Sequence, residues 1–379
     1  MSLLRVRPVA TPAMIATFDD HATIADALAF EVALARAQAA EGIVAVESVD
    51  AIEVAAAAFV IDPARLADDA ALAGTIAIPL VAALRRMLPG PAAAALHRGA
   101  TSQDVADTVL MRQLRRGAAL LRRDVDRVLA ALTPLARSHA ATPAIGRTLL
   151  QDAQPIGFGL RIAQWQAGIA AAAARVEREV SANAVLQWGG AAGTRPDQNG
   201  RSAQVAARLA RALGLPDAPP WHARREGVAG IAAAIAILIG ALGKMARDVA
   251  LLAQNGIAEA HEPVVAGRGG SSAMAHKRNP TGCQVALSAA TRAPGLVAGI
   301  VAALPAEEER GLGGWQAEGP MLIDLFLLAS GVADAMAVVA EGLEIEGAAI
   351  ARNLDAAGQG ADIGDSAALV EALLAMRKG

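Results

Sequence analysis

The chain has 379 residues, a net charge of −3, a single cysteine and a hydrophobic fraction of 54%. Nucleic-acid binding depends on a concentrated positive field, so this charge and the lack of any run of five like charges argue against a nucleic-acid partner. One cysteine excludes an intramolecular disulfide and a thiolate metal site, and it favours a reducing, cytoplasmic location.

The predicted secondary structure is helical nearly throughout, because apolar residues recur every three to five positions. We expect an all-α fold, a long-helix bundle with a small N-terminal helical domain (1–91), a central bundle domain (92–342) and a short C-terminal helical appendage (343–379). Besides the helix that starts near residue 101, long helices are predicted at about 24–41, 155–186, 201–213, 226–256, 280–303 and 320–341.

The segment 97–104, HRGATSQD, precedes the first long helix of the central part. Thr101 and Asp104 have the spacing of a capping box, which places the helix start at TSQD. Hydroxyls and free backbone N–H groups at the positive end of a helix favour an anionic ligand, and an ordinary N-cap is the alternative. His97, taken alone, is interpreted most simply as a partnered surface histidine.

The segment 146–155, GRTLLQDAQP, is expected to form a loop and then a helix start. Its Gln151 can donate a hydrogen bond to a carboxylate without adding a titratable group. Taken alone, the segment gives little indication of function.

Residues 228–243, VAGIAAAIAILIGALG, form the most membrane-like stretch of the chain. The stretch is shorter than the ~20 apolar residues of a spanning helix and consists mostly of alanine and glycine. We therefore expect a buried bundle helix and no membrane contact.

The segment 267–280, GRGGSSAMAHKRNP, combines hydroxyls, fixed cations, an imidazole and an amide behind a run of glycines. Such a segment suits a loop that closes over an anion and carries a catalytic group with it. The order of residues does not match the GxxxxGK[ST] motif of a phosphate-binding loop.

Together, these three polar segments resemble the motifs of the fumarase/aspartase superfamily, HxGxTSxDxxDT, GRTHxQxAxP and GSSxMPxKxNP. Within it, VLQWGGAAGT, PWHARRE and ERGLGGWQAE are similar to segments of the 3-carboxy-cis,cis-muconate cycloisomerases. The resemblance implies an enzyme of aromatic degradation that acts on a polycarboxylate without metal or cofactor. It also implies a homotetramer whose active sites are shared between subunits.

The resemblance implies a role for each motif residue. Ser271 would deliver a proton to carbon and remove it in reverse, with its alkoxide stabilised by loop N–H groups and Lys277. His97 would orient or polarise a substrate group as a third catalytic residue. The expected carboxylate-binding residues are Thr101, Ser102, Gln151, Asn279, Arg310 and Arg225. Arg310 has an alternative, a surface salt bridge with Glu307 or Glu309, and Arg225 is a weaker candidate because a salt bridge is its alternative too.

Leu149 is the informative departure from the superfamily pattern, because the related lyases carry histidine directly after GRT. An amine or hydroxide leaving group needs a proton as it departs, so loss of the acid should cost about 10²–10⁴-fold in rate. A carboxylate needs none, and in carboxymuconate cycloisomerisation the moving oxygen belongs to a carboxylate of the substrate.

Two alternatives to a cycloisomerase stay open at this point. A C–N lyase that releases fumarate would need another acid in place of Leu149. A non-catalytic helical oligomer is favoured by Ala275, where the signature has proline, and by Arg224, where related sequences often have an uncharged polar residue.

Overall fold

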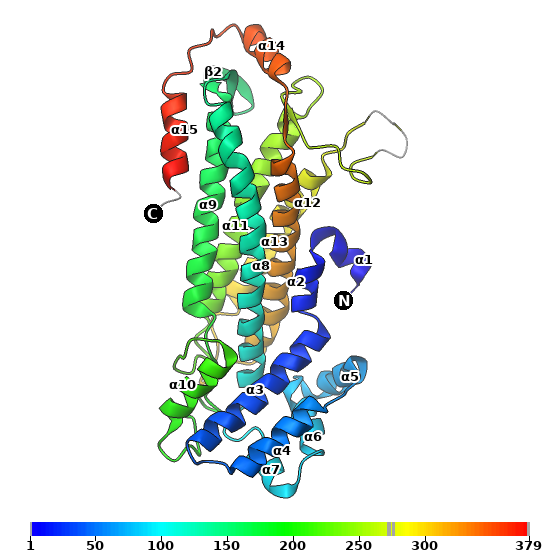
Figure 1. Ribbon diagram of the computed structural model, residues 1–379, viewed down its shortest axis with the longest axis vertical. Coiled ribbons are helices and arrows are strands. Elements are labelled where there is room, and N and C mark those ends of the chain that lie inside the picture. The colour runs from blue at the N-terminus through cyan, green and yellow to red at the C-terminus, as the bar shows by residue number, and fades with distance from the viewer. Residues whose placement is uncertain (1, 271–273, 275–276, 377–379) are drawn as a thin grey trace.

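The computed structural model describes residues 2–270, 274 and 277–376. Long helices run side by side along one axis and form an elongated bundle (Figure 1). They are α8 (Ser102–Ser138), α9 (Phe158–Asn183), α11 (Glu226–Leu252), α12 (Thr281–Ala302) and α13 (Gly314–Glu341). The predicted all-α, long-helix fold is confirmed.

Shorter helices gather mainly at one end of the bundle (Figure 1). Those before α8 are α1 (Leu3–Val6), a 3₁₀ turn (Arg7–Val9), α2 (Pro12–Thr17), α3 (Asp20–Ala40), α4 (Val46–Ala57), α5 (Pro63–Ala73), α6 (Ala77–Arg85) and α7 (Gly90–Ala95). The others are α10 (Ser202–Leu213), α14 (Gly347–Ala357) and α15 (Ser366–Ala375), which packs against α9. The 3₁₀ turn and α2 contact the central helices, and the predicted domain boundaries stay a prediction.

The core is built from aliphatic side chains and a few aromatic rings at close helix crossings. Phe326 on α13 is fully buried and packs edge-to-face on Phe18, with 6.0 Å between ring centroids. Gly117 makes room for this ring, since a Cβ at that position of α8 would lie 2.8 Å from it. Small residues therefore set how closely α8 and α13 approach.

The segment 146–155 differs from its prediction, because it belongs to a β-hairpin. Strand β1 (Pro143–Thr148) pairs antiparallel with β2 (Gln151–Gly157), and α9 begins at Phe158 rather than near 155. A second short pair joins β3 (Ala260–His261) to β4 (Glu344–Ile345). Both pairs lie at the end of the bundle opposite the start of α8 (Figure 1).

Helix α11, which contains residues 228–243, is longer than that stretch, and α12 and α13 are also long and apolar. By length and composition alone, α11, α12 and α13 would each suffice to cross a membrane. In the structure they pack against one another, and 78% of the most apolar window of α13 is buried. Packing, and not the length of the helix, is therefore what supports the assignment of α11 to the bundle.

The close contact of α13 with the 3₁₀ turn gives a test of this packing. A Cβ at Gly331 would lie 2.2 Å from the carbonyl oxygen of Val9, so Gly331→Ala should lower the free energy of unfolding by about 1–3 kcal/mol. A Cβ at Gly168 on α9 would meet no atom within 4 Å, so Gly168→Ala should stabilise by about 0.5–1 kcal/mol. Urea unfolding measures both, and equal effects would contradict the predicted contact.

Candidate active site

The start of α8 is fixed by a buried carboxylate. Asp104 accepts hydrogen bonds from the N–H groups of Thr101 (3.0 Å), Gly189 (2.9 Å) and Gly190 (2.9 Å). Its Oδ1 also lies 2.8 Å from Nε2 of His222. The predicted capping box of Thr101 and Asp104 is present. Asp104 also joins the start of α8 to the segments around Gly189 and His222.

A guanidinium and a hydroxyl meet at this helix start. Arg310, in the loop before α13, is exposed and donates from Nη1 to Oγ1 of Thr101. Glu307 instead accepts the N–H of Leu312 at 3.0 Å, and within the described part of the chain Arg310 forms no salt bridge with Glu307 or Glu309. Ser102 is the half-buried first residue of α8. A cation, a hydroxyl and a helix N-terminus together favour an anion here.

His97 lies just ahead of this helix start and is held by a carboxylate. Its Nδ1 is 2.6 Å from Oε1 of Glu31, whose side chain is fully buried. Burial lowers the pKa of His97, but the charge and hydrogen bond of Glu31 and the charge of Asp104 outweigh it, so the pKa is raised. A protonated His97 adds a positive charge beside the anion site.

Arg225 does not face this site, contrary to its prediction as a substrate ligand. It is 2% exposed and donates to both oxygens of Asp107, at 2.7 and 3.0 Å, and to Oε2 of Glu318, at 2.6 and 2.9 Å. The Arg225 guanidinium therefore donates to buried carboxylates inside the fold and not toward the anion site. Arg224 is exposed, with Nη1 3.8 Å from Glu226.

Gln151 lies at the far end of the bundle, on the exposed tip of the β1–β2 hairpin. The two turn residues, Leu149 and Leu150, have φ values of 52° and 63° and are 96% and 76% exposed. Turns with two positive φ angles normally carry asparagine or glycine, so the tip is strained. Gln151 is exposed and paired with Thr148 across the turn.

The described residues of the signature segment (267–280), which are 267–270, 274 and 277–280, lead into α12 at the same end of the bundle as the hairpin (Figure 1). Ser271 and Ala275 lie outside the described residues. Lys277 and Asn279 line a cavity of about 190 Å³ together with His261 and Arg268. Glu262 closes the start of α12 by accepting the N–H groups of Gly282 (3.0 Å) and Cys283 (2.6 Å). The cationic and amide side chains of Lys277, Arg268 and Asn279 could hold a carboxylate in this cavity.

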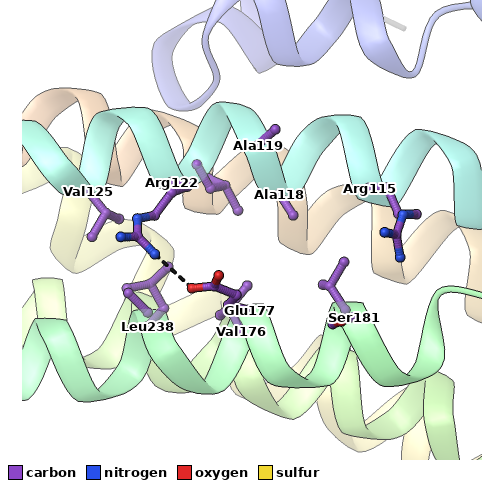
Figure 2. A pocket seen from close by; sticks show the side chains of 12 residues that line it. Arg115, Ala118, Ala119, Arg122, Val125, Val176, Glu177, Ser181 and Leu238 are labelled. Atoms are coloured by element: carbon purple, nitrogen blue, oxygen red, sulfur yellow. Dashed lines mark hydrogen bonds and ion pairs between the residues drawn. The ribbon is translucent and has the colours of Figure 1, made fainter. Parts of the chain in front are cut away.

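A groove between α8 and α9 is separate from all these residues (Figure 2). It encloses about 330 Å³ over alanine and valine side chains, and an ion pair of 2.7 Å between Arg122 and Glu177 crosses it. None of the described candidate site residues lines this groove, so it is not the candidate active site.

Apart from Arg225, the described candidate site residues of one chain therefore lie in two groups. His97, Thr101, Ser102 and Arg310 gather at the start of α8. The hairpin that carries Gln151 follows the end of that helix, whose 37 residues span about 55 Å. The signature segment and Arg310 are separated by α12, whose 22 residues span about 33 Å.

A family model described as lyase matches residues 7–295. The chain belongs to the fumarase/aspartase superfamily of lyases. A 3-carboxy-cis,cis-muconate cycloisomerase of Bradyrhizobium diazoefficiens is 44% identical over 94% of this chain and 80% of the relative. The crystal structure of 3-carboxy-cis,cis-muconate lactonizing enzyme from Pseudomonas putida matches with a TM-score of 0.88 and 38% identity, over 99% of this chain and 88% of that one. A nitrosuccinate lyase of Streptomyces davaonensis is 42% identical over 71% of this chain and 58% of the relative.

Sequence reasoning missed His222 and Glu31, which hold Asp104 and His97. His222 stands in the PWHARRE segment beside Arg224 and Arg225, and nothing in its local sequence marks it as a partner of Asp104. Both partners are more than sixty positions from the residues that they bind, so only the fold reveals them.

The raised pKa of His97 predicts a pH-dependent stability. Protonated His97 stabilises the folded state below its unfolded pKa of about 6.5, and this contribution is lost as the pH rises through the higher folded-state pKa. Between about pH 6 and 9, the free energy of unfolding should therefore fall more for the parent than for His97→Gln. Chemical unfolding at several pH values measures this, and parallel profiles would refute a charged His97–Glu31 pair.

Proposed function

We propose that this protein is a 3-carboxy-cis,cis-muconate cycloisomerase. It would form the carboxymuconolactone by adding a substrate carboxylate to the diene and delivering a proton to the neighbouring carbon. The observation that carries the proposal is the 44% identity to the cycloisomerase of Bradyrhizobium diazoefficiens over 94% of the chain. The whole-chain likeness to the Pseudomonas putida lactonizing enzyme supports it.

The chemistry of the hairpin tip agrees with this reaction. Leu149 offers no proton, and its side chain is almost fully exposed rather than folded away beside a substitute acid. In lactone formation the carboxylate oxygen makes the new C–O bond, and in reverse it leaves as a stable anion. Neither direction needs an acid at the position of Leu149.

The catalytic roles follow from where charge develops. As the carboxylate adds, the adjacent carbon becomes carbanionic and shares its charge with a second carboxylate of the substrate. We assign proton delivery to Ser271, and the stabilisation of that enolate-like charge to Lys277 and Asn279. Thr101, Ser102, Arg310 and protonated His97 would hold another carboxylate, with Gln151 on the same anion or its neighbour.

Each complete site would be assembled from several copies of the chain, as a homotetramer. Two observations support this arrangement. The residues at the start of α8 lie about 55 Å from the hairpin of the same chain. In addition, only 22% of the most apolar window of α12 is buried within one chain, which leaves an apolar helix face for another copy to cover. We expect the assembly to be cytoplasmic and free of metal and cofactor.

The similarity to nitrosuccinate lyase favours one second candidate, a C–N lyase. Leu149 argues against amine release, because an amine must be protonated as it leaves. It does not argue against loss of a stable anion such as nitrite. A non-catalytic role is less well supported, since Lys277 and Asn279 still line a polar cavity.

Turnover of 3-carboxy-cis,cis-muconate tests the proposed reaction. Loss of the ultraviolet absorbance of the conjugated diene is expected with the parent protein. Ser271→Ala should lower kcat at least about 10²-fold, because the proton donor is removed. An unchanged spectrum with the parent, together with fumarate release from a nitro- or amino-succinate, would replace the proposal with a C–N lyase. Equal activity in parent and variant would exclude the role of Ser271.

Mixing two inactive variants tests the shared active site. Thr101→Asp keeps a good N-cap residue but places a negative charge in the anion site, while Ser271→Ala removes the proton donor. If these residues reach one site from different chains, random reassembly should restore up to about a quarter of the parent activity. Reassembly of each variant with itself is the control, and no recovery in the mixture would place both residues of a site on one chain.

A further inference from the structure

A buried charge cluster lies behind the anion site at the start of α8. Arg225 is the N-cap residue of α11, and its guanidinium bridges Asp107 on α8 and Glu318 on α13. Arg225, Asp107 and Glu318 are 2%, 2% and 0% exposed, respectively. Three helix starts are thus joined through one side chain.

The cluster is hard to explain as a source of stability. Removing three charges from water is costly, and well-packed apolar residues often stabilise a fold as well or better. Two carboxylates share one guanidinium, and Oε1 of Glu318 has no hydrogen-bond partner among the described residues. Burial raises the pKa of Glu318 even though Arg225 acts in the opposite direction. Such a cluster is better suited to fixing geometry.

The geometry that it fixes is that of the anion site. Asp107 lies two turns into the helix that Thr101 caps, and Glu318 lies in the second turn of the helix that follows Arg310. The N–H of Gly313, between Arg310 and Glu318, donates to Gln316 at 3.0 Å, so the start of α13 is capped by its own side chain. Arg225 therefore links the two elements whose side chains, Thr101 and Arg310, meet in the site.

The segment around Arg225 forms further hydrogen bonds with α8. Gln103 donates to the carbonyl oxygen of His222 at 3.0 Å and to Asp107 at 3.2 Å. Asp104 is held by the His222 ring at 2.8 Å. The first turns of α8 are thus fastened on the side of α11, whereas the start of α13 is joined to this network by Glu318 and Arg225.

We infer that Arg225 and Glu318 form a positioning pair that holds Arg310 against Thr101, so that the two can bind one carboxylate of a polycarboxylate substrate. The inference rests on the proposed function for the class of ligand. Loss of the pair should let the start of α13 shift, and the affinity for the carboxylate should fall through Arg310 while the proton-transfer step on the signature segment is left intact.

Calorimetric titration with propane-1,2,3-tricarboxylate tests the inference without requiring turnover. Glu318→Gln keeps the size of the side chain and removes the charge, and it should weaken binding about tenfold, within the range of coupling between residues in one network. In an Arg310→Ala background the same substitution should weaken binding less than about twofold. Arg225→Lys, which keeps the charge but loses the two-sided fork, should repeat this pattern.

The matched control is Asp26→Asn, which removes a buried carboxylate on α3 that pairs with Arg112 at 2.9 Å and with Arg116. It should lower the melting temperature but change tricarboxylate binding less than about twofold. Equal losses with and without Arg310, or unchanged binding in both cluster variants, would overturn the inference, as would a parent protein that does not bind the probe.

The kinetic readout separates this inference from the proposed function. If the parent turns over 3-carboxy-cis,cis-muconate, Glu318→Gln should raise KM about tenfold and keep kcat within about twofold. A parent that binds the tricarboxylate with the predicted coupling but does not turn over the muconate would contradict the proposed function alone. A fall in kcat at unchanged KM would overturn the positioning role.

Discussion

The rigid length of α8 is the constraint on which the rest of the molecule depends. Its 37 residues pack against α9 and α13 and span about 55 Å, so Thr101 at one end lies far from the hairpin that follows the other end. No side-chain rearrangement closes such a distance. The chain is therefore a scaffold that presents different candidate segments at opposite ends, and in the proposed homotetramer another copy would complete the site at each end.

The start of α8 combines buried acids with a proposed anion site, and the two are compatible because positive charge lies close to both. The starts of α8, α11 and α13 meet around Arg225, and each adds the partial positive charge of a helix N-terminus. The buried carboxyl groups of Asp104 and Asp107 lie here, and they accept hydrogen bonds from backbone N–H groups and from Arg225. Arg310 supplies positive charge on the accessible side, and His97 adds to it when protonated, since Glu31 raises its pKa. The buried acids thus connect the helix starts, while the cations on the accessible side are available to the proposed anionic substrate.

The sequence predicted what local patterns determine. Apolar periodicity located the long helices, and the spacing of Thr101 and Asp104 located the start of α8. The hairpin was missed because Leu149 and Leu150 occupy turn positions that give no local signal. Arg225 was assigned to the substrate because its partners, Asp107 and Glu318, are 118 and 93 positions away. Long-range ion pairs have no sequence pattern, so the fold alone could correct this assignment.

The tip of the β1–β2 hairpin combines a strained backbone with the position, Leu149, at which the chain lacks an acid. Two leucines at positive φ cost on the order of 1–3 kcal/mol each in a single chain, and their exposure gains nothing there. Both costs are offset if the tip enters a neighbouring subunit, where apolar side chains leave water. Leucine at this tip can then exclude water from the reacting carboxylate, whereas a histidine would offer a proton that a stable anion does not need. The proposed cyclisation therefore needs no acid at position 149, whereas an elimination that releases an amine would need one.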